Sequence, residues 1–248
     1  MPTIDLNADV GEGAGNDAEL IPLVTSANIA CGGHAGDALT MAAAVRWAID
    51  HGVAIGAHPG HEDREHFGRQ EIAITPDALR RLLFAQVDRL HSVAAGLGGE
   101  VRYVKLHGAL YHQTGRDAAL AAAVVAFVHD YHTPLALLGQ AGTALQEAAD
   151  RADVAYFAEA FADRAYLDDG TLAPRSLPGA MLASESAVVA QAGRLARDGV
   201  AVSMSGKEIA IRCDSLCLHG DGANAVELTR AVRAALEAEG ITLRAFSV

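Results

Sequence analysis

Short runs rich in β-branched and apolar residues alternate along the chain with longer runs rich in Ala and Leu that have helical periodicity. The runs expected to form strands are 3–8, 26–30, 53–57, 101–106, 135–138, 154–158 and 215–218. The runs expected to form helices are 37–50, 77–95, 117–130, 143–151, 185–198 and 224–239. Strands separated by helices pair in parallel, and the helices cover the resulting sheet. The alternation therefore predicts an α/β fold.

The first predicted strand distinguishes an open, doubly wound sheet from a closed barrel. Asp5, Asn7 and Asp9 alternate with apolar residues, so their side chains share one face of the strand. In an open sheet between two helix layers, both faces of a central strand are apolar. A polar face fits a barrel interior, and 248 residues match the usual size of a (β/α) barrel. We therefore predict one domain, residues 1–248, with a TIM-like barrel of about seven parallel strands.

The composition limits the partners and the compartment. Asp and Glu outnumber Lys and Arg by 31 to 19, and this acidic excess argues against binding to nucleic acid or to an acidic membrane surface. The chain shows neither a basic and apolar leader nor a run of about 20 apolar residues that would span a bilayer. Its three cysteines lack the spacing of a metal or redox motif. These features predict a cytoplasmic protein whose cysteines are reduced core residues.

Three apolar runs end at a histidine followed by a small residue or proline, in the segments AIGAHPG, YVKLHGALY and SLCLHGDG. In parallel α/β folds the loops after the strands meet at the carboxyl edge of the sheet, where functional side chains gather. The sequence therefore predicts an active site at this edge. The polar residues at or just after the predicted strand ends are Asp9, Glu12, Asn28, His34, Asp37, His58, Lys105, His107, Glu159, His219 and Asp221.

Several of these residues also have a purely structural explanation. A histidine at a strand end is often a buried residue with satisfied hydrogen bonds, and Asp37 and Asp221 are suited to cap the helices that follow them. As functional groups, histidines beside carboxylates could act as general acids and bases. Lys105, one of only two lysines, could stabilise an anion or a developing oxyanion.

A metal centre is a further hypothesis from the same positions. His58, His107 and His219 with neighbouring carboxylates could bind a divalent ion that activates water, although the chain lacks a His-x-x-x-His pair on a helix. Common nucleotide-binding motifs are absent, because GEGAG lacks the last glycine of the dinucleotide fingerprint and SGKE lacks the leading glycine and the hydroxyl residue of a P-loop. The residues alone leave acid–base catalysis and metal catalysis both open.

Six segments, in order from residue 4 to about residue 221, resemble the LamB/YcsF family: DLNADVGEG, SANIACGGHAGD, GVAIGAHPG, KLHGALY, FADRAYLDDGTLAPRSLPGA and CLHGD. The resemblance implies a barrel related to the glycoside hydrolase/deacetylase barrels. It also implies the activity of the A subunit of ATP-dependent 5-oxoprolinase, which opens the lactam of 5-oxo-L-proline to L-glutamate with hydrolysis of ATP. The implied partners are the B and C subunits, and ATP would be a co-substrate accompanied by Mg²⁺.

The resemblance is the basis for hypotheses about individual residues. The predicted catalytic residues are Asp9, Glu12, His58, Lys105, His107, His219 and Asp221. The predicted substrate-binding residues are Asn28, His34, Asp37, Glu159 and Arg164. Lys105 from the first set and Arg164 from the second are expected to bind the substrate carboxylate or the transferred phosphate. Two other functions stay open: a stand-alone metal-dependent amide hydrolase or deacetylase, and a non-catalytic subunit that positions the substrate for its partners.

Overall fold

Seven parallel strands close into a ring in the computed structural model of the chain, which describes residues 2–220, 222 and 224–246. The ring consists of β1 (Thr3–Val10), β2 (Ser26–Ala30), β3 (Ala54–His58), β4 (Val101–Lys105), β5 (Ala136–Gln140), β6 (Tyr156–Phe161) and β9 (Ser215–Leu218). Pairing of β9 with β1 closes it. The short β10 (Thr242–Leu243) pairs with the start of β1. The predicted barrel of about seven parallel strands is confirmed.

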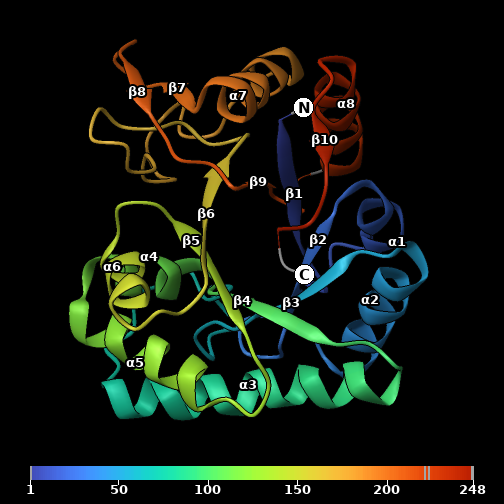
Figure 1. Cartoon of the computed structure of the whole chain (residues 1–248), viewed down its shortest axis with the longest axis vertical. Coiled ribbons are helices and arrows are strands. Elements are labelled where there is room, and N and C mark those ends of the chain that lie inside the picture. Colours follow the sequence, from blue (N-terminus) through green and yellow to red (C-terminus); the bar gives the residue numbers. More distant parts are fainter. Residues whose placement is uncertain (1, 221, 223, 247–248) are drawn as a thin grey trace.

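Helices surround the ring on the outside (Figure 1). The predicted ones are α2 (Ala38–His51), α3 (Pro76–Gly96), α5 (Ala118–Asp130), α6 (Ala144–Arg151), α7 (Glu185–Asp198) and α8 (Ala225–Ala238). The strands β7 (Val200–Val202) and β8 (Glu208–Ala210) form a separate antiparallel hairpin. Across the part of the chain that the structure describes, no helix is long and apolar enough to cross a membrane.

Two short helices are not predicted by the sequence pattern. They are α1 (Asp17–Leu20), followed by the 3₁₀ turn η1 (Ile21–Leu23), and α4 (Gly108–Arg116). Glycine at the first position of α4 and again at Gly115 lowers the intrinsic helix propensity of this segment. Burial of Ala109, Leu110 and Thr114 accompanies helix formation there, so tertiary packing outweighs the weak local preference.

The outward face of β1 forms part of the main apolar core. Its members Ile4, Leu6, Ala8 and Val10 are buried between the strands and the helices. From α3 the same core receives the apolar stripe Leu79, Leu83, Val87 and Leu90. Each fully buried side chain of this size stabilises the fold by about 1.5–3 kcal/mol.

The inward face of β1 is polar and is part of a hydrogen-bond network in the barrel interior. Asn28 donates over 2.8 Å to the side-chain oxygens of both Asn7 and Asp9. The Tyr103 hydroxyl in turn donates to Asn28 over 2.7 Å. The Tyr103 ring lies across Gly56, where an added Cβ would come within 2.1 Å of it. A side chain at position 56 would therefore displace the tyrosine that anchors this network.

Asp5 lies further along the same polar face, towards the amino end of β1. Its carboxylate accepts hydrogen bonds from the hydroxyls of Thr25, Ser26 and Ser215. Burial raises the pKa of Asp5 to about 6, although these hydroxyls oppose the shift. An aspartate in an unfolded chain has a pKa of about 3.9, so the folded protein holds this proton more tightly. The stabilisation from this group is complete below about pH 4 and is lost as the pH rises through about 6.

Raising the pH from about 4 to about 7 should therefore lower the free energy of unfolding by about 3 kcal/mol through the ionisation of Asp5, since one pKa unit corresponds to about 1.4 kcal/mol. Asp5→Asn keeps the shape of the side chain and cannot ionise, so the unfolding free energy of this variant should lack this decrease with pH. Urea unfolding at a series of pH values measures the effect. Asp50→Asn, at an exposed position of α2, is the control and should retain the wild-type slope. Equal slopes for Asp5→Asn and the wild type would contradict the assignment.

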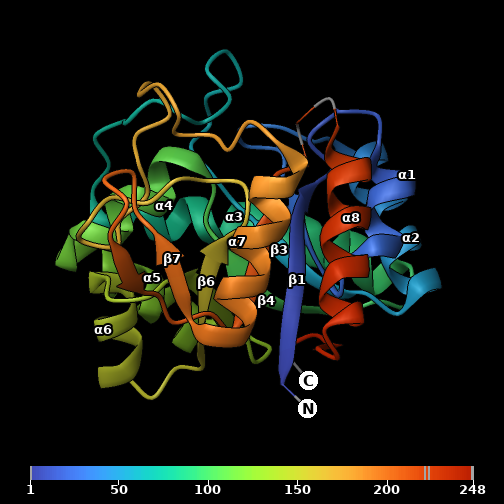
Figure 2. The ribbon, with the colours of Figure 1, turned by 90° about the horizontal axis from the view of Figure 1, so that it is seen from above.

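The seven ring strands run in parallel, so their carboxyl ends lie on one side of the barrel. Figure 2 shows the long segments between β3 and α3 and between β6 and α7 on that side. Strand ends and long loops together therefore frame one end of the barrel, which is where functional groups gather in folds of this type.

Candidate active site

A cavity of about 580 Å³ opens at the carboxyl ends of the strands. It collects side chains from segments that lie far apart in the sequence, at the ends of β1, β3, β4, β6 and β9. The structure thus brings a large part of the predicted site together around one hollow. The predicted residues that line it are Asp9, Glu12, His58, Lys105, His107, Arg164 and His219.

Lys105 lies beside the cavity with its side chain buried among acidic groups. Its ammonium nitrogen is 2.8 Å from Asp9 Oδ1 and 2.7 Å from Glu159 Oε1. It also donates to Cys217 Sγ over 3.2 Å. Burial opposes the charge, but the attraction of Asp9 and the other acidic groups keeps the pKa of Lys105 well above its usual value. The cavity therefore contains a permanent positive charge of the kind that stabilises a developing oxyanion.

Asp9 connects this lysine to a group of imidazoles. Its Oδ1 accepts hydrogen bonds from Lys105 and Asn28, and its Oδ2 lies 3.4 Å from His58 Nε2. Burial opposes ionisation, yet His58 and Lys105 hold the pKa of Asp9 well below its usual value. Burial likewise disfavours a charged His58, but the attraction of Asp9 raises the pKa of that imidazole. Asp9 is therefore ionised at neutral pH.

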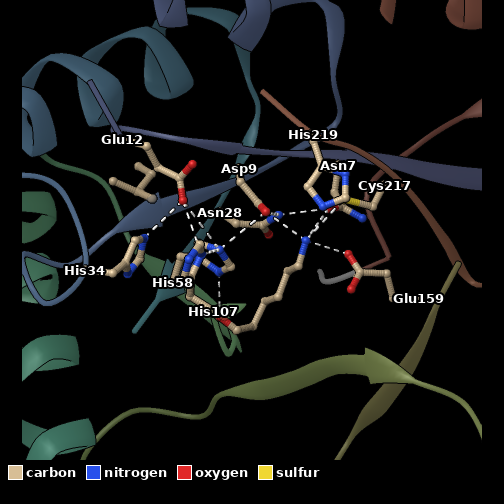
Figure 3. Close-up of polar contacts among 12 residues, drawn as sticks. Asn7, Asp9, Glu12, Asn28, His34, His58, His107, Glu159, Cys217 and His219 are labelled. Atoms are coloured by element: carbon tan, nitrogen blue, oxygen red, sulfur yellow. Dashed lines mark hydrogen bonds and ion pairs between the residues drawn. The ribbon is translucent and has the colours of Figure 1, made fainter. Parts of the chain in front are cut away.

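Three imidazoles surround Glu12 on one side of Asp9 (Figure 3). Glu12 Oε1 lies 3.0 Å from His34 Nε2, 3.3 Å from His107 Nδ1 and 3.9 Å from His58 Nε2. Burial opposes ionisation of Glu12, but its close contacts with His107 and His34 lower its pKa to about 2. Burial lowers the pKa of His34 to about 4 and also lowers the pKa of His107. An ionised Glu12 therefore faces neutral His34 and His107 rings.

His219 lies away from this cluster and has a carboxylate partner of its own. Its Nδ1 donates to Asp163 Oδ2 over 2.8 Å, and its backbone amide donates to the same oxygen over 3.2 Å. Burial opposes ionisation, but the attraction of His219 lowers the pKa of Asp163. Because Asp163 accepts the proton on Nδ1, the other ring nitrogen is the one that can exchange a proton with a ligand.

The predicted substrate-binding residues fall into different environments. Asn28 and Glu159 are buried outside the cavity lining, where they hold Asp9 and Lys105. His34 also lies outside the lining; its ring stacks on that of His107 with the centroids 3.6 Å apart.

Two predicted residues are not part of this arrangement. Asp37 is exposed at the start of α2, where its side chain accepts hydrogen bonds from the backbone amides of Leu39 and Thr40. It is a helix cap and does not line the cavity, so the structural explanation accounts for it. Asp221 lies outside the described residues.

Arginines form another part of the cavity wall. Arg164 is predicted and Arg175 is not, and both line the cavity. Arg164 Nη2 donates to the backbone oxygen of Ala173 over 2.6 Å, while its buried Nε has no hydrogen-bond partner among the described residues. Burial, followed by the nearby charge of Arg175, lowers the pKa of Arg164 to about 10. Arg164 is still charged at neutral pH and has a donor left for a carboxylate or phosphate oxygen.

Four side chains could hold a metal ion, because one ligand atom from each lies within 4.8 Å of the others: Glu12, His34, His58 and His107. The sequence-based set of His58, His107 and His219 differs from this group. His219 is paired with Asp163, and His34 joins the cluster instead. Strand-end position alone does not distinguish these alternatives, because both histidines follow a strand.

The model of the LamB/YcsF family matches residues 4–248. The chain belongs to the LamB/YcsF family. This LamB/YcsF protein is similar to a lactam utilization protein from Thermus thermophilus, with 42% sequence identity and a TM-score of 0.92 over 98% of this chain and 100% of the other. It also shares its fold with a T48 deacetylase solved with substrate, at 12% identity and a TM-score of 0.52 over 98% of this chain and 87% of the other.

Sequence reasoning misses two residues of the site in this LamB/YcsF chain. Asp163 lies two residues beyond the end of β6, and Arg175 lies in the long segment before α7. The strand-end rule could have found Asp163, which stands in the segment FADRAY beside the predicted Arg164. Arg175 has no comparable signal, because only the folding of its loop over the cavity brings it there.

Proposed function

We propose that this LamB/YcsF protein is the A subunit of an ATP-dependent 5-oxoprolinase, which hydrolyses the lactam of 5-oxo-L-proline to L-glutamate together with B and C subunits. Membership of the family and the similarity to a lactam utilization protein support the substrate class. The observation that carries the proposal is the buried Lys105 ammonium, held between two carboxylates at a cavity that is also lined by His219, which pairs with Asp163 behind it.

The chemistry explains why ATP would be needed. The carbonyl carbon of a five-membered lactam is a poor electrophile, and the ring closes readily. Transfer of the γ-phosphoryl group of ATP to the carbonyl oxygen releases ADP and activates that carbon. Water adds to it, the C–N bond breaks as the nitrogen takes up a proton, and a second water releases phosphate from the resulting acyl phosphate. The products are L-glutamate, ADP and phosphate.

The geometry supports a distinct role for each part of the site. His219, held by Asp163, is the candidate base for the attacking water and the acid for the leaving nitrogen. Lys105 stabilises negative charge on the carbonyl or phosphoryl oxygen. Arg164, with its unpaired buried Nε, binds the carboxylate of the substrate. Mg²⁺ would enter with ATP.

Asp163→Asn should lower kcat for glutamate release by at least about 100-fold with little change in KM. An asparagine nitrogen facing His219 would favour the wrong imidazole tautomer, so proton transfer fails while the cavity keeps its shape. Steady-state kinetics of the reconstituted complex measure both constants. Asp50→Asn serves as the matched control on the surface of α2. An unchanged kcat would remove His219 from the role of base.

Arg164→Gln should raise KM for 5-oxoproline by about 10–100-fold, because a hydrogen bond to a charged group contributes about 1.5–3 kcal/mol. Arg80→Gln removes an arginine that pairs with Asp130 away from the cavity and should leave KM unchanged. If Arg164→Gln changes kcat alone, Arg164 does not bind the ground-state substrate.

The decisive assay measures ATP-dependent release of glutamate from 5-oxoproline by the purified chain, with and without candidate B and C subunits. Turnover that requires ATP and all partners supports the proposal. Binding of 5-oxoproline combined with full turnover after loss of each cavity histidine would indicate a subunit that only positions the substrate.

A second candidate function is a stand-alone metal-dependent amide hydrolase. The observation that favours it is the buried cluster of Glu12 with three imidazoles, a donor set typical of catalytic metal centres. Release of product by the chain alone, without ATP and with an added divalent metal, would support this candidate over the first.

A further inference from the structure

Two backbone carbonyls determine which nitrogens of His58 and His107 carry protons. A carbonyl oxygen only accepts hydrogen bonds, so His58 Nδ1 donates to the oxygen of Lys105 and His107 Nε2 donates to the oxygen of Phe67, each over 2.8 Å. A metal-binding imidazole is neutral, and in neutral rings with these hydrogen bonds the remaining nitrogens, His58 Nε2 and His107 Nδ1, carry lone pairs. They face each other at 3.0 Å. Two lone pairs at this distance repel each other unless a cation lies between them.

The carboxylate of Glu12 faces the same point. Its Oε1 is 3.3 Å from His107 Nδ1 and 3.9 Å from His58 Nε2. Nitrogen and oxygen ligands lie about 2.0–2.2 Å from a tetrahedral zinc ion, which places them about 3.4 Å from one another. The three separations observed here, 3.0, 3.3 and 3.9 Å, bracket that value. The donors are thus already spaced for one ion.

His34 differs from the other two imidazoles in the cluster. Its Nε2 lies 3.0 Å from Glu12 Oε1, a distance at which the nitrogen donates its proton to the carboxylate. The same nitrogen is then not available to an ion. Through this hydrogen bond His34 fixes the orientation of the Glu12 carboxylate, a role that hydrogen-bond partners of metal-binding side chains commonly have. The other three side chains line the cavity and His34 does not, so an ion bound by them would keep a position open to the cavity.

We propose that Glu12, His58 and His107 bind one divalent transition metal ion with an open position towards the cavity, and that His34 positions Glu12 without ligating. The site shares the cavity of the proposed 5-oxoprolinase, but metal binding is independent of ATP and of partner subunits. The competing explanation for the two facing lone pairs is a proton on His58 shared with His107 and Asp9.

The test titrates the chelator-treated full-length chain with Co²⁺, whose visible absorption reports low-coordinate binding, and with Zn²⁺ by calorimetry. We expect one ion per chain. Glu12→Gln and His58→Ala should each weaken binding by at least about 100-fold, and His107→Ala should do the same. His34→Ala should keep the stoichiometry and the cobalt bands but weaken binding by about 10–100-fold. Circular dichroism checks the fold, and the near-isosteric Glu12→Gln covers the case in which an alanine variant unfolds.

His132→Ala is the matched control, because His132 and His91 form a second close imidazole pair with their Nε2 atoms 3.4 Å apart at the surface. It should leave the bands and the affinity unchanged. Absence of Co²⁺ and Zn²⁺ binding in the wild type would overturn the proposal in favour of the shared proton. Binding that survives Glu12→Gln and His58→Ala but is lost in His132→Ala would overturn it too. None of these readouts uses turnover, so failure here is distinguishable from failure of the ATP-dependent assay.

Discussion

Replacing Lys105 with methionine should abolish glutamate release by the reconstituted complex and lower the free energy of unfolding by about 3–5 kcal/mol. The ammonium group is buried and lies within 2.8 Å of Asp9 and Glu159, so its removal takes the neighbouring cation away from two carboxylates buried in the barrel interior. The charge that would stabilise the reacting oxygen is lost at the same time. Urea unfolding and a glutamate-release assay measure the two effects separately.

A double variant separates the structural from the chemical role of this lysine. Lys105→Met combined with Glu159→Gln also removes the negative charge of the Glu159 carboxylate and should recover part of the lost stability. Activity should stay lost, because the glutamine supplies no positive charge. Recovery of turnover in the double variant would mean that Lys105 acts only by supporting the fold.

Replacing His107 with alanine should also lower glutamate release by at least about 100-fold while the protein still folds. His107 contacts both Glu12 and His58, so its loss removes one wall of the imidazole cluster in the cavity. It also removes a hydrogen bond to the backbone oxygen of Phe67, which should cost only about 1 kcal/mol of stability. Turnover and thermal melting of the variant are the measurements.

His129→Ala is the control for this prediction, because the His129 side chain is 75% exposed on α5 and is not part of the cavity lining. It should match the wild type in turnover and melting. Near wild-type activity of His107→Ala would exclude the cluster from the reaction and leave His219 and Lys105 as the reacting centre.

Much of the fold is predictable because its periodicities are local. The stripe of α3 and the alternation in β1 each follow from residues that are neighbours in the chain. The polar face with Asp5, Asn7 and Asp9 even indicates closure into a barrel, since a polar strand face fits a barrel interior and does not fit an apolar layer of helices. Helix α4 is missed because its glycines give little local preference, and only packing decides its conformation.

The sequence predicts that the site lies at the strand ends, but it does not predict which side chains of the site contact one another. Histidines at 58, 107 and 219 all stand where a strand meets its loop, and they do line one cavity. Which carboxylate each imidazole faces depends on loop paths over many residues, so the pairing of His219 with Asp163 is not written in any local pattern. For the same reason a capping aspartate, Asp37, is indistinguishable in sequence from one that binds a ligand.

The sequence by itself determined the order of the seven ring strands and of the six predicted helices, the polar lining of the barrel and the edge at which chemistry is expected. Side-chain periodicity and the direction of parallel strands depend on residues that are close in the chain. Only the tertiary structure decided that Lys105 is held between two carboxylates and that His34 rather than His219 joins Glu12. Those contacts span long separations in the chain. Burial then shifts the protonation of each group, and burial exists only once the barrel has closed.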